Sequence, residues 1–375
     1  MKILKSCLSQ SWGGMEMFTI TTARYLLKRN NQVEFLVYPN SRIHQEAKSL
    51  NVPIHTCKAS GYFHPKEIIN VSSLLKKSNF DIIHTQASKD LWVLVPALKI
   101  RKLVTPILLT KQVGSFIIKK DIFHKWIYNR LNYALAISNV IAQNLYDTCP
   151  LNKDRILLLH NAVDTGRFDP QKVDSKKVRN EFNISDDDIL IGMLARFSWG
   201  KGHEEFLYAA RELKKKYKNL KFMIIGEPSR GEDEYADKIK QMVKDYSIED
   251  IVIFTGFRKD TPEVLAALDI FAFPSHSEAF GIALVEAMSM EKPSVCSASD
   301  GVLDIAVDGV TSYLFEKQNA QDFTNNLEKL ILSKETRINF GKNARKRAIE
   351  YFDLEYYTDK LLSIYNKALT EPLLK

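Results

Sequence analysis

Cysteine and long apolar runs are both scarce in this chain. Its 375 residues include four cysteines, which lie far apart and form no Cys-x-x-Cys pair. Isolated cysteines of this kind argue against a zinc site and a disulfide framework and indicate a reducing compartment. No apolar run approaches the roughly 18 to 20 residues that span a bilayer, and Lys2 and Lys5 interrupt what would be the core of a secretory signal. We therefore expect a cytoplasmic protein.

Motifs for several ligand classes are missing as well. The chain has no G-x-G-x-x-G sequence for a dinucleotide and no zinc-finger or RRM sequence. Asp186–Asp188 falls in a predicted turn, and no Asp-x-Asp stands where a metal site is plausible. Lys and Arg form no dense block of the kind that binds nucleic acid. We expect no bound cofactor, no metal and no nucleic-acid partner.

Positive charge is concentrated in the first part of the chain. Residues 1–160 contain 22 Lys and Arg against 9 Asp and Glu, a balance of +13, whereas the remainder contains 31 against 36. A basic first half indicates an anionic partner for that half alone. Because nucleic-acid motifs are missing, we favour an anionic membrane surface.

Short apolar segments alternate with helical patterns in both halves, which predicts parallel sheets covered by helices on both faces. Residues 157–170 are rich in turn formers and predict an interdomain connection. We therefore predict an α/β protein with two doubly wound domains that face each other across a cleft. The domains are assigned to residues 1–163 and 164–350, and residues 351–375 to a C-terminal helix that could cross back to the first domain.

Two glycine-containing loops are candidate phosphate sites. Gly13 and Gly14 follow the first predicted strand and open a helix, where a backbone can approach a phosphate closely. An ordinary tight turn explains this pair equally well. Arg196 and Lys201 lie between a strand and a helix of the second half. A guanidinium and an ammonium can bind a diphosphate there, although solvated surface is an equal alternative.

The most informative segment leads from a buried strand through a loop into a helix. The N–H groups of Phe280, Gly281 and Ile282 stand near the predicted helix start and could cradle an anion. Glu286 lies one helical turn further and can accept the hydroxyls of a ribose. Glu278, in the loop, can accept hydroxyls of a sugar. Two carboxylates could also form a glycosidase acid–base pair, but a carboxylate beside a phosphate cradle suits hydroxyl recognition better.

In their order and spacing these motifs resemble the retaining glycosyltransferases of family 4, which have the GT-B fold of two Rossmann-like domains. The resemblance covers nearly the whole chain. It rests on the motifs above, with Glu278 and Glu286 as a Glu-x7-Glu pair, and on Asn161–Asp164, Ile224–Gly226 and Phe254–Phe257.

The resemblance implies a donor held mainly by the second domain and an acceptor held by the first. It implies that Arg196 and Lys201 bind the diphosphate of a nucleotide sugar, that Glu286 binds its ribose and that Glu278 binds its sugar. The expected reaction is metal-independent transfer of a hexose or N-acetylhexosamine with retention of configuration. A UDP-sugar is favoured as donor, with GDP-mannose as the alternative.

Three positions depart from the family pattern. His84 keeps only the first histidine of a frequent His-x-His, Lys111 stands where histidine is common, and Asp304 replaces a longer acid. His84 is either a structural histidine at a strand end or a contact to substrate hydroxyls, and we include it among the catalytic candidates. Lys111 is either solvated or in contact with an anionic acceptor.

Residues 115–130 combine apolar side chains with Lys119, Lys120, Lys125 and Trp126. This composition is typical of a helix in a membrane interface, and equally of a helix packed on its own sheet. Together with the basic first half and the usual bacterial assignments of the family, it favours a lipid-linked or lipopolysaccharide saccharide of the cell envelope as acceptor. We expect peripheral binding to the inner face of the cell membrane.

Two other functions remain open. A nucleotide-sugar 2-epimerase can share the GT-B fold, and inversion of the sugar without any acceptor would identify it. A non-catalytic module that binds a nucleotide sugar or an anionic lipid is the other alternative. Loss of a motif cation or carboxylate would have favoured the module, and none is lost.

Overall fold

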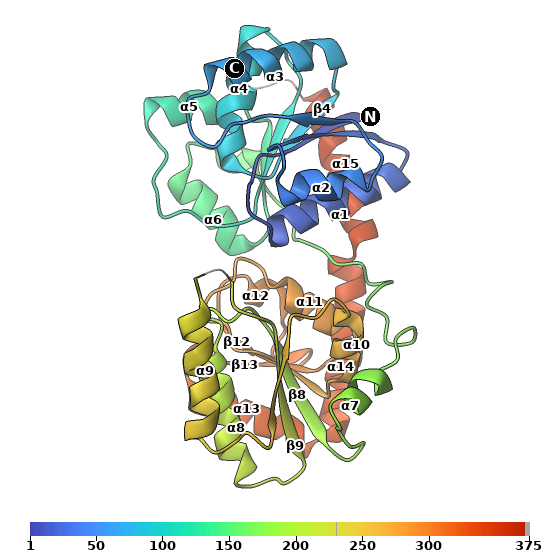
Figure 1. Ribbon diagram of the computed structural model, residues 1–375. Helices are drawn as coiled ribbons and strands as arrows, with labels where there is room; N and C mark the ends of the chain where they lie inside the picture. The colour runs from blue at the N-terminus through green and yellow to red at the C-terminus, as the bar shows by residue number, and fades with distance from the viewer. Residues whose placement is uncertain (230, 372–375) are drawn as a thin grey trace. The chain divides into compact units, whose positions relative to one another are not determined.

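The computed structural model describes residues 1–229 and 231–371, which form two units (Figure 1). The first unit contains residues 1–160 together with the C-terminal helix α15 (Leu354–Thr370), and the second contains Asn161–Asp353. Each unit is built on one parallel sheet with helices on its faces. The predicted pair of doubly wound, Rossmann-like domains is therefore confirmed.

The sheet of the first unit has seven strands in the order β3-β2-β1-β4-β5-β6-β7. Strand β6 is buried along its whole length, which is why it is a continuous run of hydrophobic residues in the sequence. The order reverses between β1 and β4, so ligands of such a sheet bind beyond the carboxyl ends of these two strands. The strands are β1 (Lys2–Cys7), β2 (Gln32–Val37), β3 (Ile54–Thr56), β4 (Ile82–Thr85), β5 (Ile107–Lys111), β6 (Tyr133–Ala136) and β7 (Ile156–Leu158). The helices that precede α15 are α1 (Gly14–Lys28), α2 (Arg42–Lys48), α3 (Pro65–Ser78), α4 (Leu91–Ile100), α5 (Ile122–Tyr128) and α6 (Asn139–Thr148).

The sheet of the second unit has six strands in the order β10-β9-β8-β11-β12-β13, and it reverses between β8 and β11. Its strands are β8 (Ile189–Leu194), β9 (Leu220–Ile225), β10 (Val252–Gly256), β11 (Ile270–Phe273), β12 (Ser294–Ser297) and β13 (Ser312–Phe315). Its helices are α7 (Lys176–Glu181), α8 (His203–Lys214), α9 (Asp233–Asp245), α10 (Thr261–Ala267), α11 (Ile282–Ser289), α12 (Val302–Ile305), α13 (Ala320–Leu332) and α14 (Lys334–Phe352).

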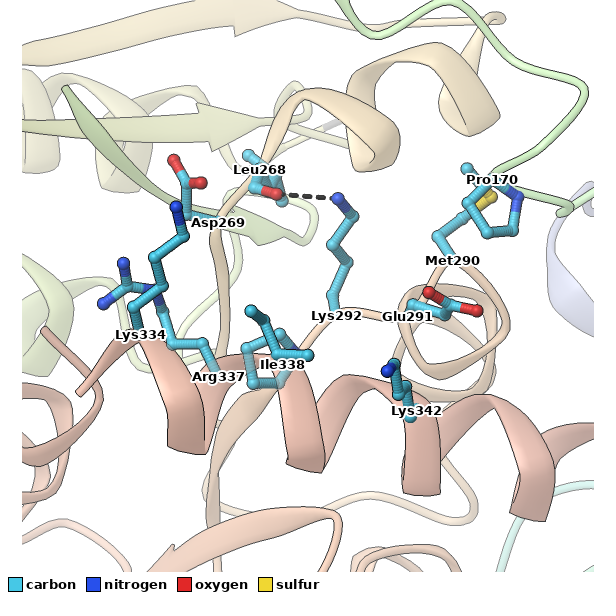
Figure 2. Close-up of a pocket in the computed structure, with 11 residues that line it drawn as sticks. Pro170, Leu268, Asp269, Met290, Glu291, Lys292, Lys334, Arg337, Ile338 and Lys342 are labelled. Atoms are coloured by element: carbon cyan, nitrogen blue, oxygen red, sulfur yellow. Dashed lines mark hydrogen bonds between the residues drawn. The ribbon is translucent and has the colours of Figure 1, made fainter. Parts of the chain in front are cut away.

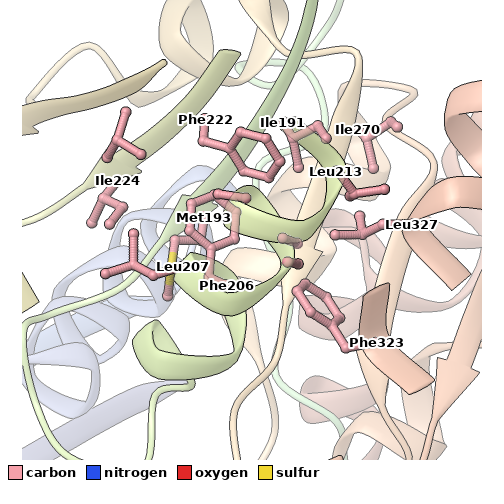
Figure 3. Packing of buried hydrophobic residues seen from close by; sticks show 14 of the residues in the cluster. Ile191, Met193, Phe206, Leu207, Leu213, Phe222, Ile224, Ile270, Phe323 and Leu327 are labelled. Atoms are coloured by element: carbon pink, nitrogen blue, oxygen red, sulfur yellow. The ribbon is translucent and has the colours of Figure 1, made fainter. Parts of the chain in front are cut away.

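A continuous apolar core fixes α8 against the sheet of the second unit (Figure 3). Phe206 and Leu213 of α8 pack with Phe222 of β9 and with Phe323 of α13, and all four side chains are fully buried. Burial of each such side chain contributes about 1.5 to 3 kcal/mol. This packing fixes both ends of the loop between β8 and α8, which carries Arg196 and Lys201.

Helix α15 completes the first unit. Tyr357 packs edge-on against Phe18 of α1 at 5.1 Å, and the Tyr365 hydroxyl hydrogen-bonds the ring of His84 in β4. Arg29 forms an ion pair with Glu355 at 2.8 Å. The last helix therefore supports the sheet built from the start of the chain. Among the described residues, no helix has the length and hydrophobicity needed to cross a membrane.

Candidate functional site

Two motif loops meet at the point where the strand order of the second unit reverses. One loop follows β8 and the other follows β11, and the N–H of His276 donates to the carbonyl of Gly200 at 2.8 Å. A Cβ at Gly202 would lie 2.3 Å from the carbonyl oxygen of Pro274, and its φ is +82°. Glycine is therefore required at this position for the two loops to touch.

Lys201 and Glu278 come from these two loops and form an ion pair. The Lys201 ammonium lies 2.6 Å from Glu278 Oε1, and both side chains are half-buried. The N–H of Gly301 donates to the Glu278 carbonyl at 3.0 Å, so a third loop, after β12, supports this position. Two residues predicted from separate motifs are thus direct neighbours.

A cavity of about 170 Å³ lies beside this pair. Arg196 also lines it, and its exposed guanidinium donates to Ser229 Oγ at 3.1 Å. Among its other lining residues are Gly281, Ile282 and Ala283, where α11 begins. The first N–H groups of a helix have no acceptor within the helix, so this end of the cavity is suited to an anion.

The residues at the start of α11 that line the cavity differ by one from the predicted set. Phe280 does not line the cavity, because its ring is buried and packs against Phe352 at 5.8 Å. Gly281 has a φ of +120°, which favours glycine, and Ala283 completes the lining instead. The cradle is therefore displaced by one residue along the chain from the predicted set.

Glu286 lies one turn further along α11 and is half-buried. Burial raises the pKa of its carboxyl to about 7, and the positive charge of Arg167 acts in the opposite direction. Its side chain does not line the cavity described above. A carboxylate with a raised pKa close to a candidate anion site is a common feature of functional sites.

One supporting pair escaped the sequence prediction. His276 Nε2 lies 2.7 Å from Glu205 Oε1, which joins the loop after β11 to helix α8. The ring also lies edge-on to Trp199 at 5.7 Å. The position of His276 two residues before Glu278 was visible in the sequence, but its partner on α8 was not.

The two glycines predicted as a phosphate site in the first unit do not line the cavity beside them. Gly13 is the N-cap of α1, and its N–H donates to Glu16 Oε2 at 2.9 Å, so a carboxylate of the chain itself stands at this helix start. Gly14 is exposed. A cavity of about 290 Å³ beside this turn is lined by Leu8–Ser11, Met15 and Asp90, among others, and by neither glycine.

His84 belongs to the core of the first unit. Its ring is fully buried, with Nδ1 2.6 Å from the Tyr365 hydroxyl and Nε2 2.7 Å from Thr110 Oγ1. Burial lowers the pKa of the ring well below its ordinary value, so it is neutral. Because both nitrogens are bonded within the core, we assign His84 a structural role in place of the catalytic contact expected above.

The basic and aromatic stretch is not one helix. A loop extends to Asp121, whose carboxylate caps the short helix α5 by accepting from the N–H groups of Phe123 and His124. Lys120, Lys125 and Trp126 are exposed, whereas Lys111 and Lys119 are half-buried. The buried residues of α5 are Ile127 and Tyr128. Packing within the first unit therefore accounts for the apolar residues at the end of α5 but not for the exposed ones at its start.

A further pocket of about 260 Å³ lies at the amino ends of β11 and β12 (Figure 2). The ammonium of Lys292 donates to the carbonyl of Leu268 at 2.8 Å, and Arg337 donates to the carbonyl of Leu330 at 2.7 Å. No predicted site residue lines this pocket.

No group of three or more His, Cys, Asp or Glu able to hold a metal ion occurs within residues 1–229 and 231–371.

Two family models match the chain. The model for Glycosyltransferase Family 4 matches residues 12–167, and the model for Glycosyl transferases group 1 matches residues 174–347. The chain belongs to the two-domain glycosyltransferases. A relative from Campylobacter jejuni is 24% identical over 96% of this chain and 98% of its own length. It is named N,N'-diacetylbacillosaminyl-diphospho-undecaprenol alpha-1,3-N-acetylgalactosaminyltransferase.

Solved structures share the fold. A glycosyltransferase from Rickettsia africae ESF-5 has a TM-score of 0.89 and 22% identity, with 99% of each chain covered. Anabaena Alr3699/HepE in complex with UDP has a TM-score of 0.84 and 20% identity, with 98% of this chain and 100% of that chain covered. These likenesses show the GT-B fold for this glycosyltransferase. Seven further curated relatives are matched over 47% to 62% of their own length.

Proposed function

We propose that this glycosyltransferase moves a hexose or N-acetylhexosamine from a UDP-sugar to a lipid-linked or lipopolysaccharide saccharide, with retention of configuration and without a metal. The observation that carries the donor assignment is the Lys201–Glu278 pair beside the start of α11. Cations, a sugar-binding carboxylate and free helix N–H groups converge there, at the reversal point of a parallel sheet.

The charge in this cavity suits a leaving diphosphate. Arg196 and Lys201 supply two positive groups, and the first N–H groups of α11 supply the positive end of a helix dipole. Negative charge develops on the diphosphate as the sugar departs, and donors already in place stabilise it without reorganisation. These groups would do what a metal ion does in other transferases, which supports metal independence.

The two carboxylates have different surroundings and take different roles. One oxygen of Glu278 is held by Lys201, so the carboxylate is fixed in place to accept a hydroxyl of the donor sugar. Glu286 is half-buried, with a pKa raised to about 7, and its ionised form is suited to accept hydroxyls of the ribose. Hydrogen bonds to a charged acceptor are the stronger kind.

Retention in this proposal needs no protein nucleophile. The acceptor hydroxyl forms its bond to the anomeric carbon on the face from which the diphosphate departs. The bond from that carbon to the phosphate oxygen breaks, and the departing phosphate takes the hydroxyl proton. The protein contributes orientation of the two substrates and stabilisation of the departing charge.

Three observations support a lipid-linked acceptor. Residues 1–160 carry a balance of +13, and large apolar side chains of the α5 region are exposed. The name of the Campylobacter jejuni relative includes an undecaprenol-linked substrate. A UDP-sugar is favoured because Anabaena HepE was solved with UDP. We propose peripheral binding at the inner face of the cell membrane.

Thermal stabilisation by a panel of nucleotides tests the donor assignment. A ligand that binds only the folded state raises the melting temperature, and saturating ligand at about 100 times Kd adds about 2.7 kcal/mol. UDP and at least one UDP-sugar should raise the melting temperature of the wild-type protein. The variant Arg196→Ala/Lys201→Ala should lose this response. A wild-type protein that no nucleoside diphosphate stabilises would overturn the assignment.

A further inference from the structure

The loop between β5 and α5 is fixed at two points to helix α6. The N–H of Ser115 donates to Asn144 Oδ1 at 2.8 Å, and the Asn144 amide donates back to the Ser115 carbonyl at 2.9 Å. Further along the loop, the N–H of Lys119 donates to the carbonyl of Thr148 at 2.6 Å. The three residues between Ser115 and Lys119 are therefore fixed on both sides by hydrogen bonds to α6.

These three residues are large, apolar and turned to solvent. The exposed fractions of Phe116, Ile117 and Ile118 are 106%, 65% and 69%. Ile122 and Phe123, at the start of α5 a few residues further along the chain, are also exposed, with fractions of 75% and 68%. Contiguous exposed apolar residues on an ordered element mark a contact surface. We call these five side chains the apolar tip.

Two ammonium groups lie at the base of this loop. Lys111 ends β5, and its ammonium donates to Ser88 Oγ at 3.4 Å. Burial, together with the nearby charge of Lys119, lowers the pKa of Lys111 to about 8. Neither lysine forms an ion pair with a carboxylate anywhere in the described part of the chain. Two like charges are thus held together without a counter-ion.

A buried hydroxyl without a partner stands in the same cluster. The Tyr128 hydroxyl is buried and lies close to Ser88 and Cys149, but it forms no hydrogen bond of normal geometry to any described residue. The polar side chains gathered here are hydroxyls, a thiol and two ammonium groups, and the ammonium groups can only donate. A buried polar group without a hydrogen-bond partner is unfavourable. Hydroxyl oxygens here can accept, as Ser88 Oγ does from Lys111, but no carboxylate among the described residues faces the two ammonium groups, and an anion would supply that negative charge.

We propose that Lys111 and Lys119 bind the phosphate that joins the acceptor's lipid to its saccharide, while the apolar tip contacts the lipid chain. A phosphate between a hydrocarbon chain and a sugar matches a cation pair placed next to exposed apolar side chains. This inference rests on the proposed function and specifies how its acceptor is recognised. Bulk phospholipid offers the same phosphate chemistry, so the experiment separates the two sources.

The test compares two kinds of phosphatidylcholine vesicle, one containing a polyprenyl diphosphate and the other phosphatidylglycerol, at equal surface charge. Saturating UDP keeps the diphosphate away from the donor site. The wild-type protein should bind the polyprenyl diphosphate vesicles with a Kd about 10- to 100-fold lower, as expected for one or two charge-assisted hydrogen bonds. Lys111→Gln/Lys119→Gln should abolish this preference, whereas Lys111→Arg/Lys119→Arg should keep it.

The matched control is Lys120→Gln/Lys125→Gln, which removes the same charge from exposed positions nearby. It should weaken binding to both kinds of vesicle by the same factor. A wild-type protein without a preference, or one that binds neither vesicle, overturns the inference, as does a Gln pair that keeps the preference. Stabilisation by UDP, measured in parallel, should be equal in all these variants. Its absence in the wild type would instead count against the proposed donor.

Discussion

At the scale of single residues, the proposed donor site rests on two cations, Arg196 and Lys201, which line the same cavity. Replacing Arg196 or Lys201 with Ala should lower kcat about 10²- to 10³-fold per group, because the departing diphosphate loses a stabilising partner already in place. The melting temperature should change little for Arg196→Ala, since this side chain is exposed. Lys215→Ala, at an exposed lysine just after α8, is the control. Near-wild-type turnover in either variant would remove that residue from the site.

The raised pKa of Glu286 predicts that UDP affinity depends on pH. The pKa of Glu286 is raised to about 7, so the side chain gains its proton as the pH falls through 7. If the ionised form accepts the ribose hydroxyls, UDP affinity should fall from pH 8 to pH 6 more steeply in the wild type than in Glu286→Gln. At pH 8 this variant should bind UDP about 1.5 to 3 kcal/mol more weakly.

Glu278→Gln is the matched control for this measurement. It should keep UDP affinity and impair transfer, because this carboxylate is assigned to the donor sugar. Titration calorimetry of UDP at the two pH values, with both variants, separates the roles. Equal losses of UDP affinity in both variants would contradict the assignment.

At the scale of elements, the site depends on the contact between two loops. Gly202→Ala would place a Cβ 2.3 Å from the Pro274 carbonyl oxygen, so the loop after β8 must move away from the loop after β11. We expect loss of stabilisation by UDP and a lower melting temperature. Gly200→Ala is the control, because its φ of +85° carries a similar backbone strain while nothing lies within 4 Å of the added Cβ. If both variants respond to UDP alike, the loop contact is not required.

The sheets and the two motif loops, after β8 and after β11, could be predicted from sequence because each depends on a local pattern. Buried parallel strands are continuous apolar runs, and the Lys201–Glu278 pair follows once β8 and β11 are neighbours. His84 could not be resolved this way, because its partner Tyr365 lies 281 positions away in the chain. The stretch 115–130 was expected to be one helix, since composition does not reveal that Asp121 caps a shorter one.

At the scale of the whole molecule, charge and exposed apolar side chains predict membrane binding. Each basic residue near an anionic surface contributes about 1 kcal/mol, and salt screens this contribution. The protein should sediment with phosphatidylglycerol vesicles at low salt and less at high salt. Lys120→Glu/Lys125→Glu should release it, whereas Lys215→Glu/Lys218→Glu, at exposed sites of the second unit, should not. Wild-type protein that stays in the supernatant at low salt would favour a small soluble acceptor.

The central claim is transfer of a sugar from a nucleotide to a lipid-linked saccharide, and NMR of the products tests it most directly. The UDP-sugar selected by thermal stabilisation is incubated with the protein, EDTA and vesicles that carry a lipid-linked saccharide. We expect one UDP released for each new glycosidic bond, with the anomeric configuration of the donor preserved. Inverted configuration, dependence on a metal, or an epimerised sugar formed without any acceptor would contradict it.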